Sequence, residues 1–519
     1  MVHLLCHSCA AVDRRAAKGH PIVALRHMNR SVWYRTRDIE QNILRHGLVI
    51  GQDSNCGERP NWKGMRPTYP RACTATYQMQ FGSGVITFCI GLSGAHTICM
   101  RNDVTPCVTM GTLRNCPSCL GAPAEVLHHQ EFDLIAGHPL ASGYDVVACH
   151  TCGFVYADTS ATQEDYNEFY EQMSKYSDPA TATGSGALAW DAERLHDTAA
   201  MVARFLDSGE SRILDLGCAG GGLLSCLRAL GFNNSIGVDP SASCVAEVKT
   251  KGLEGVQSSI GSLTLPPRSF DCIVLSGVLE HVRDLHGALK GLVPLLKTNG
   301  FLYIEVPDAT AYAEYLYSPF QDFNTEHINH FSPSTLRSLV KRFGLCPVFE
   351  GRKSIRSSAT SFYPDIYGVF RADSDGAGED GTDGLTGRIK LYIAASRQMM
   401  NELSERLDLD LPGSGGVIVW GVGQLTMKLL KYSPLAQSNI VAFVDSSPVN
   451  RGRLLRQVRI VGPEDLRGLP HPIVIASLLH QSEIAQQIRS MGLDNRLILL
   501  RDRPEIPFIH QETQPRSES

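Results

Sequence analysis

The residues most informative about chemistry lie between positions 212 and 241. An apolar run ends in Asp215, turns through a glycine-rich stretch that includes Gly217 and Gly221, and continues as a helical pattern. A second short apolar run ends in Asp239, 24 positions after Asp215. Glycines let the backbone pass close to a ligand, and an acid at the end of the second strand can bind two ribose hydroxyls. The pattern predicts a nucleotide-binding βαβ unit.

The order of residues in this turn argues against a dinucleotide. The turn reads D-x-G-x-A-x-G, where dinucleotide folds have G-x-G-x-x-G. A pyrophosphate needs amides aimed at phosphate, whereas S-adenosylmethionine (SAM) has no phosphate and carries a cationic ammonium and sulfonium. A carboxylate beside the turn suits such a cation, and the motif resembles the class I SAM-dependent methyltransferase signature. The residues expected to bind SAM are Asp215, Gly217, Ala219, Gly221 and Asp239.

Two further segments place acids and imidazoles where this ligand would react. In an open parallel sheet, ligands bind beyond the carboxyl ends of the strands. LSGVLEHV gives Glu280 and His281 after one predicted strand, and NTEHINHF gives Glu326, His327 and His330 after the next. Methyl transfer needs an aligned acceptor that loses a proton, which suits histidine because its ordinary pKa is about 6.5. We interpret the two Glu-His pairs as functional; the alternative is that each histidine caps a helix or lies on the surface.

Four cysteines form a second chemical pattern. Cys116 and Cys119 make one C-x2-C pair, Cys149 and Cys152 make another, and 29 residues separate the pairs. Each pair predicts a tight turn with two thiolates pointing to one centre, so that two turns close a tetrahedral zinc site. Four thiolates leave no position open for catalysis, so we expect a structural zinc. Buried free thiols are the alternative interpretation.

Hydrophobic periodicity places these residues in an α/β fold. Residues 190–207 have the pattern of an amphipathic helix, strand segments follow at 271–282 and 300–308, and a helix start lies at 332–336. This alternation fits a parallel sheet with crossover helices. We predict a class I SAM methyltransferase Rossmann-like sheet, preceded by a small four-cysteine zinc module and followed by a second Rossmann-like lobe.

The chain therefore divides into six predicted segments. These are an atypical segment at 1–109, the zinc-binding module at 110–165, the methyltransferase domain at 166–345, a linker with an acidic glycine-rich loop and a helix at 346–410, the Rossmann-like lobe at 411–510, and a tail at 511–519. The first segment holds seven of the sixteen cysteines and only one apolar run, at 84–92. We interpret it as sequence outside the native protein, which would start at Met110. A disordered basic extension and a cysteine-rich module are the alternatives.

The second lobe carries a weaker nucleotide signal. Its predicted βαβ unit contains Gly421, Gly423 and, 22 residues after Gly423, Asp445. Thr426 stands where a dinucleotide motif has its third glycine, and a lone G-x-G with a distant acid is a weak indication. We expect a Rossmann-like lobe that binds no dinucleotide.

Composition excludes several classes of function. The 48 basic and 53 acidic residues nearly balance, so nothing indicates a nucleic-acid partner. No apolar run approaches the roughly 18 residues of a membrane span, and no secretory signal follows Met1. We therefore expect no membrane contact and a cytoplasmic location, where paired cysteines are metal ligands rather than disulfides.

The order of these parts resembles that of a known family. A four-cysteine module, a SAM fold with an E-H pair after its fourth strand, a later x-x-E-H segment and a second lobe opening V-W-G-x-G are similar to the C-methyltransferases of nucleotide-linked keto-deoxysugars, over about 110–510. The resemblance implies zinc at the four cysteines, SAM at the turn, His281 in the active site, and His327 as general base beside Glu326. It also implies that His327 removes a proton next to a C4 ketone and that the enolate attacks the methyl group. The expected partner is a small-molecule acceptor, a nucleotide sugar.

Two positions depart from the family pattern. The tyrosine of its Y-x-E-H motif is Asn324 here, and its upstream pocket tyrosine falls approximately on Tyr176. We place Tyr176, Glu280, Asn324 and His330 in the substrate site. The missing phenol leaves open another sugar, a glycan hydroxyl or a different small molecule, and O-methylation by the same histidine is the alternative reaction. A zinc-ribbon scaffold with an inactive methyltransferase fold is the alternative outside catalysis.

Overall fold

The computed structural model describes residues 114–502, apart from 122, 174–182, 359–360 and 373–382, together with the backbone of strands between residues 12 and 101. The chain forms two compact units, residues 1–111 and 112–519. Tyr176, most of the predicted acidic loop and the predicted tail lie outside the described residues. Every side chain discussed below belongs to the second unit.

The first unit contains two antiparallel sheets. One consists of β1 (Val12–Ala17), β2 (His20–His27) and β3 (Arg30–Arg35); the other consists of β4 (Ile50–Asp53), β5 (Cys73–Phe81), β6 (Gly84–Gly91) and β7 (His96–Arg101). β6 coincides with the apolar run noted at 84–92, whereas the other strands were not expected. The interpretation of residues 1–109 stays a prediction.

The centre of the second unit is a seven-stranded sheet in the order β13-β12-β11-β14-β15-β18-β17. Its strands are β11 (Ile213–Leu216), β12 (Ser235–Asp239), β13 (Glu254–Gln257), β14 (Phe270–Ser276), β15 (Leu296–Pro307), β17 (Leu345–Arg356) and β18 (Phe362–Ala372). β18 runs antiparallel to both of its neighbours, β15 and β17, and the other strand pairs of the sheet are parallel. The strand order reverses between β11 and β14, so a ligand crevice is expected beyond their carboxyl ends.

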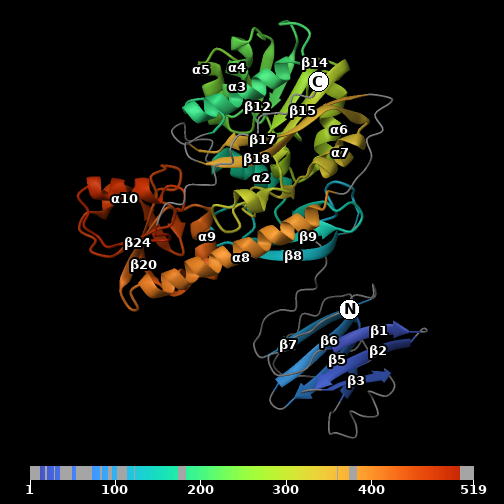
Figure 1. The fold of residues 1–519 in the computed structure, drawn as a ribbon, viewed down its shortest axis with the longest axis vertical. Coiled ribbons are helices and arrows are strands. Elements are labelled where there is room, and N and C mark those ends of the chain that lie inside the picture. The colour runs from blue at the N-terminus through green and yellow to red at the C-terminus, as the bar shows by residue number, and fades with distance from the viewer. Residues whose placement is uncertain are drawn as a thin grey trace, which may run out of the picture. The chain divides into compact units, whose positions relative to one another are not determined.

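Helices cover both faces of this sheet, as Figure 1 shows. α3 (Ala189–Ala203), α4 (Gly222–Ala229) and α5 (Ala242–Thr250) lie on one face, and α6 (Leu285–Leu292) and α7 (Pro333–Lys341) lie on the other. Side chains alternate along β11, so that Ile213 packs with α3 and α4 while Leu214 packs with α6 and α7. This double burial explains the apolar runs read from the sequence.

A four-stranded antiparallel sheet carries the cysteine pairs, in the order β16-β10-β9-β8. Its strands are β8 (Pro123–Glu131), β9 (Gly143–Cys149), β10 (Val155–Asp158) and β16 (Asn329–His330), and α2 (Gln163–Gln172) follows β10. β16 lies far along the chain, between β15 and α7, yet it pairs with β10. The cysteine module therefore shares a sheet with the segment that immediately follows His327.

The C-terminal lobe is a second doubly wound sheet, in the order β21-β22-β20-β19-β23-β24. Its strands are β19 (Gly416–Trp420), β20 (Asn439–Val444), β21 (Leu454–Leu455), β22 (Val458–Val461), β23 (Ile473–Ile475) and β24 (Leu497–Leu499), all parallel except β21. Its helices are α8 (Leu385–Asp410), α9 (Gln424–Tyr432) and α10 (Gln481–Ser490).

Short 3-10 helices also occur along the second unit. Those that precede the C-terminal lobe are η2 (Leu279–His281), η3 (Val293–Leu295) and η4 (Tyr312–Tyr315), and those within the lobe are η5 (Pro434–Gln437) and η6 (Pro463–Leu466).

α8 is the helix that was expected within the segment 346–410, and it packs against η4 and α9. No helix in the described part of the chain combines the length and the apolar composition that crossing a bilayer requires.

Candidate active site

The glycine turn between β11 and α4 is shaped by three residues with left-handed backbone. The φ angle is +72° at Gly217, +44° at Ala219 and +75° at Gly221, where α4 begins. Because left-handed backbone favours glycine, Ala219 is the strained position of the turn. A Cβ atom on Gly217 would lie only 2.8 Å from Val278 Cγ2. Glycine at 217 therefore lets the loops after β11 and β14 approach each other.

Asp239 ends β12 beside this turn, and backbone amides hold its carboxylate. Ala219 N donates to Oδ2 at 3.0 Å, and Ser241 N donates to Oδ1 at 2.9 Å. Burial raises the pKa of Asp239. Each oxygen can accept a further hydrogen bond, so the carboxylate can take two adjacent ribose hydroxyls.

Asp215 lies beneath the same turn and differs from Asp239 in its partners. It is 3% exposed, and its Oδ2 has no hydrogen-bond partner among the described residues. Burial, with a further contribution from the charge of Asp239, raises the pKa of Asp215 to about 8. A buried acid with a spare oxygen beside a second acid favours a cationic ligand over an anionic one. The residues of this turn therefore fit SAM and do not fit a pyrophosphate.

A cavity of about 620 Å³ extends from the glycine turn along the carboxyl ends of the strands to the C-terminal lobe. The residues predicted from the sequence that line it are Gly217, Ala219, Asp239, Glu280, His281, Asn324, Glu326 and His327. Asp215 and Gly221 lie outside its lining. Ser258, Ser259 and Ile260, which follow β13, also line the cavity, although no local motif marks them. The volume lies within the range of small-molecule sites.

The segment that carries His327 is fixed by the side chain of Asn324. Asn324 Oδ1 accepts hydrogen bonds from the backbone N–H groups of Glu326 and His327, both at 2.8 Å. Its Nδ2 donates to Gln321 O at 3.1 Å, and Tyr144 OH donates to its backbone oxygen at 2.7 Å. Asparagine readily makes such turns because its short amide reaches nearby backbone groups. The residue at the family's tyrosine position thus shapes the backbone before the histidine.

His281 and His327 lie against each other at the cavity wall. Their ring centroids are 4.8 Å apart with an interplanar angle of 74°. His281 Nδ1 is 3.1 Å from the backbone oxygen of Glu326, which assigns the proton to Nδ1 and leaves Nε2 with the lone pair. That Nε2 lies 3.7 Å from Glu280 Oε1. The ring of Tyr170 in α2 packs edge-on against His281 at 5.7 Å and lines the cavity.

The structure places His330 away from this cluster. His330 is fully buried in β16 and does not line the cavity. Its ring packs against Tyr312 and Phe323, and Nδ1 lies 3.4 Å from Tyr312 OH. Burial lowers the pKa of His330 to about 3, so the ring is neutral. Its surroundings are those of a core side chain rather than of a substrate contact.

Several ionisable side chains of the cavity wall were not predicted, and five of them lie deep within the wall. These five are Glu305, Asp322, Tyr363, Asp365 and Lys428. Burial raises the pKa of Asp322 to about 6 and lowers that of Lys428 to about 7. Tyr363 OH donates to Asp322 Oδ1, and Lys428 Nζ donates to Phe320 O. A charged residue inside an apolar run, as at Glu305 and Lys428, is the only sequence signal that could have marked any of them.

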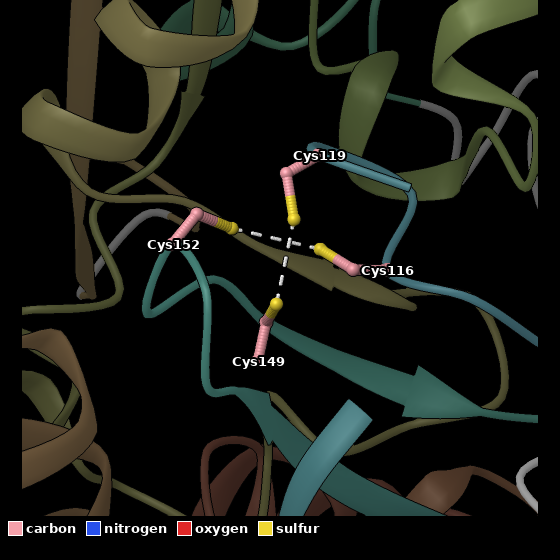
Figure 2. Close-up of side chains that lie close together, drawn as sticks. All are labelled: Cys116, Cys119, Cys149 and Cys152. Carbon is pink, nitrogen blue, oxygen red and sulfur yellow. Dashed lines mark hydrogen bonds between the residues drawn. The ribbon is translucent and has the colours of Figure 1, made fainter. Parts of the chain in front are cut away.

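The two C-x2-C pairs converge on one point, as Figure 2 shows. Cys116 Sγ lies 3.7 Å from Cys152 Sγ, and Cys119 Sγ lies 3.4 Å from Cys149 Sγ. All four sulfurs lie within 4.8 Å of one another. A tetrahedral zinc ion with Zn–S bonds of about 2.3 Å needs sulfurs about 3.8 Å apart. The four thiols therefore fit a structural zinc ion.

Asn329 connects the cysteine module to the catalytic cluster. Its Oδ1 accepts from Arg114 Nη2 at 2.9 Å, two residues before Cys116. Its Nδ2 donates to the backbone oxygens of Leu279 and Val282, at 2.8 and 2.7 Å, on either side of Glu280 and His281. Asn329 thus ties the cysteine module to the loop after β14 and to the His327 segment. The sequence pattern gave no hint of this role.

The C-terminal lobe reaches the same cavity through the start of α9. Gly423 and Gln424 line it, and Gln424 Nε2 donates to Thr325 Oγ1 at 2.8 Å. Thr426 Oγ1 donates to Gly421 O at 2.6 Å, so the hydroxyl at the third-glycine position closes the turn. The lobe therefore contacts the segment that carries His327 directly.

The strand order, the antiparallel β18, the glycine turn and the acid that ends β12 define a class I methyltransferase fold. Residues 190–348 match the methyltransferase-domain family, and residues 414–499 match the C2185-like N-terminal family. The chain therefore carries a SAM-dependent methyltransferase domain, flanked by a four-cysteine module and a second Rossmann-like lobe.

Curated methyltransferases are similar to part of the chain. A probable S-adenosylmethionine-dependent methyltransferase of Mycobacterium tuberculosis is 26% identical over 149 residues, which are 27% of this chain and 52% of the relative. The trans-aconitate 2-methyltransferase of an Enterobacter species is 30% identical, over 23% of this chain and 49% of the relative. The ubiquinone biosynthesis O-methyltransferase of Bradyrhizobium diazoefficiens is 35% identical over 101 residues, which are 18% of this chain and 40% of the relative. The chain thus spans about half the length, or less, of these relatives.

Proposed function

We propose that this chain transfers the methyl group of SAM to a carbon atom of a nucleotide-linked keto-sugar, with His327 as general base. The observation that carries the proposal is that the SAM-type glycine turn and His327 line one cavity. Bound SAM supplies an electrophilic methyl group on a positively charged sulfur. The chain has to place the acceptor in line with that methyl group and to remove a proton from it.

The arrangement around His327 suits proton removal from carbon. His281, held through Nδ1 by the backbone oxygen of Glu326, packs against the His327 ring and keeps it at the cavity wall. The His327 imidazole takes the proton from the carbon next to the ketone, and the C–H electron pair becomes the enolate. The enolate carbon then forms the new C–C bond as the bond from sulfur to methyl breaks, and His327 releases its proton to solvent. Glu326 and Asn324, on the same wall, are placed to contact the acceptor.

The cavity also suits an acceptor with several hydroxyl groups. One carboxyl oxygen each of Glu305, Asp322 and Asp365 lacks a hydrogen-bond partner in the part of the chain that the structure describes, and all three residues line the cavity. Unpartnered buried oxygens favour a ligand that brings hydrogen-bond donors. The cavity extends to the C-terminal lobe, which leaves room for the nucleotide part of such an acceptor.

O-methylation is the second candidate, because some relatives of this chain are named O-methyltransferases. The same histidine would then deprotonate a hydroxyl group. The two reactions differ in the proton that leaves, because only C-methylation removes a hydrogen from carbon.

The test is an assay of the purified full chain with isotope-labelled SAM and a panel of nucleotide sugars, some with a ketone and some without. Mass spectrometry of the product locates the label. We expect a methyl group on carbon and, in deuterated water, exchange of the α-hydrogen that depends on His327. A labelled O-methyl ether without α-hydrogen exchange would establish the second candidate instead, and no transfer to any acceptor would favour a scaffold.

The proposal includes a structural zinc ion at the four cysteines and a cytoplasmic setting that keeps them reduced. Metal analysis of the protein, purified without added metal, should find one zinc per chain. Less than stoichiometric zinc in folded, active protein would contradict this part of the proposal.

A further inference from the structure

Three of the buried carboxyl groups that line the cavity come from three different elements. Glu280 lies in η2, Glu305 in β15 and Asp365 in β18, with exposed fractions of 3%, 1% and 5%. Glu280 Oε2, Glu305 Oε1 and Asp365 Oδ1 have no hydrogen-bond partner within the described ranges. An unsatisfied buried carboxyl is costly, so three on one wall point to a ligand that completes them.

The strand register places Glu305 and Asp365 side by side. Glu305 pairs with Tyr367, and Asp365 pairs with Pro307. Paired residues of an antiparallel ladder point to the same face, and so do residues two apart on one strand. Glu305 and Asp365 are therefore diagonal neighbours on one face of the sheet, within reach of each other.

Among these three acids, Glu305 is the one that forms a salt bridge with a lysine within the described residues. Lys353 Nζ lies 2.7 Å from Glu305 Oε2, and Tyr303 OH and Thr198 Oγ1 donate to the same oxygen at 2.6 and 3.1 Å. Burial opposes ionisation of Glu305, but the charges of Lys353 and Arg194 and the hydrogen bonds from Lys353 and Tyr303 together outweigh it and lower the pKa of Glu305. Glu305 is therefore the fixed negative charge of the group.

The other two acids keep their protons near neutral pH. Burial and the charge of Glu305 raise the pKa of Asp365 well above its usual range, against the opposing charges of Lys353 and Arg194. Burial, with further contributions from the neighbouring acids Asp365 and Glu305, raises the pKa of Glu280 to about 8. A protonated carboxyl group carries an O–H donor, which an ionised one lacks.

Glu280 is also the acid that lies beside the base. One carboxyl oxygen of Glu280 and one ring nitrogen of each of His281 and His327 lie within 4.8 Å of one another. Ile328 N donates to Glu280 O at 2.8 Å, which fixes the His327 segment against η2. A ketone oxygen and the hydrogen on the neighbouring carbon belong to one small group. A donor to that oxygen and a base for that hydrogen must therefore be neighbours.

We propose that Glu280 is a catalytic residue that acts as a neutral carboxylic acid, donating its O–H to the acceptor ketone oxygen that becomes the enolate oxygen. This inference rests on the proposed C-methylation. The proton that leaves carbon goes to His327, the negative charge moves to the oxygen facing Glu280, and the Glu280 proton stays in the hydrogen bond. Glu305 is the positioning residue, because its fixed negative charge keeps Glu280 protonated. A preformed donor aimed at developing charge stabilises such a transition state.

The experiment measures the enolisation step alone. The full chain, with S-adenosylhomocysteine filling the donor site, is incubated in deuterated water with a nucleoside diphosphate-linked 4-keto-deoxyhexose. Mass spectrometry then follows deuterium entering the α-position. Glu280→Ala should slow exchange by about 10²- to 10³-fold, the usual loss for one oxyanion donor. Glu280→Gln keeps an N–H donor of similar shape and should retain most of the rate.

The pH profile separates this role from a structural one. Exchange in the parent protein should fall as the pH rises past about 8, where Glu280 loses its proton and becomes a like charge beside the enolate. In Glu280→Gln the fall should disappear, because an amide does not ionise in this range. The titratable and charged groups that face Glu280 or its two acidic neighbours are His281, His327, Tyr303, Tyr312, Tyr363, Glu305, Asp308, Asp365, Lys353 and Arg194. All of these groups are still present in Glu280→Gln. If the exchange rate of this variant no longer decreases at high pH, the decrease in the parent protein is due to ionisation of Glu280.

Two controls keep the outcomes distinct. Calorimetric titration with SAM checks that each variant is folded. Asp271→Asn changes a carboxylate at the other end of β14, where Asp271 pairs with Lys297, and should leave exchange unchanged. If Glu280→Ala exchanged at the parent rate, or if exchange in Glu280→Gln still decreased at high pH, the role of Glu280 would be wrong while the proposed C-methylation could stand. Methyl transfer to oxygen with no exchange in the parent protein would overturn the proposed function as well.

Discussion

The chain contains two parallel sheets with a glycine turn after the first strand and an acid after the second, and they differ in what those acids bind. In the methyltransferase sheet, Asp239 is held by two backbone amides at the cavity, and Asp215 keeps an oxygen without a partner in the described structure. In the C-terminal lobe, Asp445 accepts from Ser447 N at 3.0 Å and from Asn450 Nδ2 at 2.8 Å, both within its own loop. Asp445 therefore stabilises its own loop, whereas Asp215 and Asp239 have oxygens that can still bind a ligand.

The strands before the two turns differ in the same way. Asp215 lies two residues before Gly217, and the residue two before Gly421 is the buried Val419. An apolar residue there offers nothing to a cation. A fold shared by two lobes therefore does not imply a shared ligand, and unsatisfied polar groups locate the functional lobe better than the glycine pattern does.

The largest expected effect is on turnover, and it distinguishes the histidine that the methyltransferase domain contributes to the cavity from the one that the C-terminal lobe contributes. His327 comes from the methyltransferase domain and His480 from the C-terminal lobe, and both line the cavity. His327→Ala should lower turnover by about 10²- to 10⁴-fold, the usual contribution of a general base. His480→Ala should cost far less. Turnover is followed with labelled SAM, and affinity for SAM by calorimetry.

SAM affinity should stay near the parent value in both histidine variants, because neither residue belongs to the glycine turn. His196→Ala, an exposed histidine on α3, is the matched control for expression and handling. Equal losses in His327→Ala and His480→Ala would mean that the base does not lie in the methyltransferase domain.

A pair of aspartate variants tests the comparison directly. Asp239→Ala should weaken SAM binding by about 10²-fold or more, since hydrogen bonds to a charged group contribute about 1.5–3 kcal/mol each. Asp445→Ala removes the corresponding acid of the second lobe and should leave SAM affinity unchanged while lowering thermal stability. Calorimetry and thermal unfolding measure the two effects. Weaker SAM binding in Asp445→Ala would show that the second lobe holds the methyl donor.

Loss of the cysteine module's metal site should disturb the methyltransferase domain and leave the C-terminal lobe intact. Cys116→Ser removes one of four converging thiols, so we expect loss of zinc and a lower unfolding temperature. Because β16 pairs with β10 of the module, turnover should also fall, through disorder of the His327 segment. Hydrogen exchange followed by peptide mass spectrometry should show opening near Asn329 and none in β19. Cys226→Ser, on α4, is the control, and the same opening there would contradict a zinc-specific effect.

Local spacing made part of this site predictable. The two C-x2-C pairs and the turn from Asp215 to Gly221 each encode their geometry within a few residues, and the structure brings each set together. Buried strands such as β14 read as apolar runs because both faces of the sheet are covered. The parallel strands β11, β12, β14 and β15 and the second lobe followed from that pattern. In contrast, most of β17 and all of β18 lie in the segment 346–410, which was predicted as a linker with a loop and a helix.

The rest depends on contacts between distant segments. Asp365 reaches the cavity only because β18 inserts antiparallel beside β15, and the register with Pro307 is not written in any local pattern. His330 carried the same signal as His327, yet it lies in the core because β16 joins the sheet of the cysteine module. Asn324, expected as a substrate contact, also has its side chain engaged in a backbone turn. Residue type and spacing could not distinguish these cases.

The smallest expected effect concerns Asp215, whose counterpart in the second lobe is Val419. Burial and Asp239 raise its pKa to about 8 in the free protein, so at pH 7 much of it is protonated. SAM is a cation and favours the ionised form, so its affinity should rise with pH up to about 8, by at most about tenfold per unit, and then level off. The raised pKa also makes the free protein less stable as the pH rises toward 8, and bound SAM should relieve that loss. Asp215→Asn should flatten both trends while binding SAM only modestly less tightly at pH 7, as followed by calorimetry and thermal unfolding across the pH range. A pH dependence of SAM affinity that survives in Asp215→Asn would assign it to Asp239 instead, and the contrast between the two lobes would then rest on that single acid.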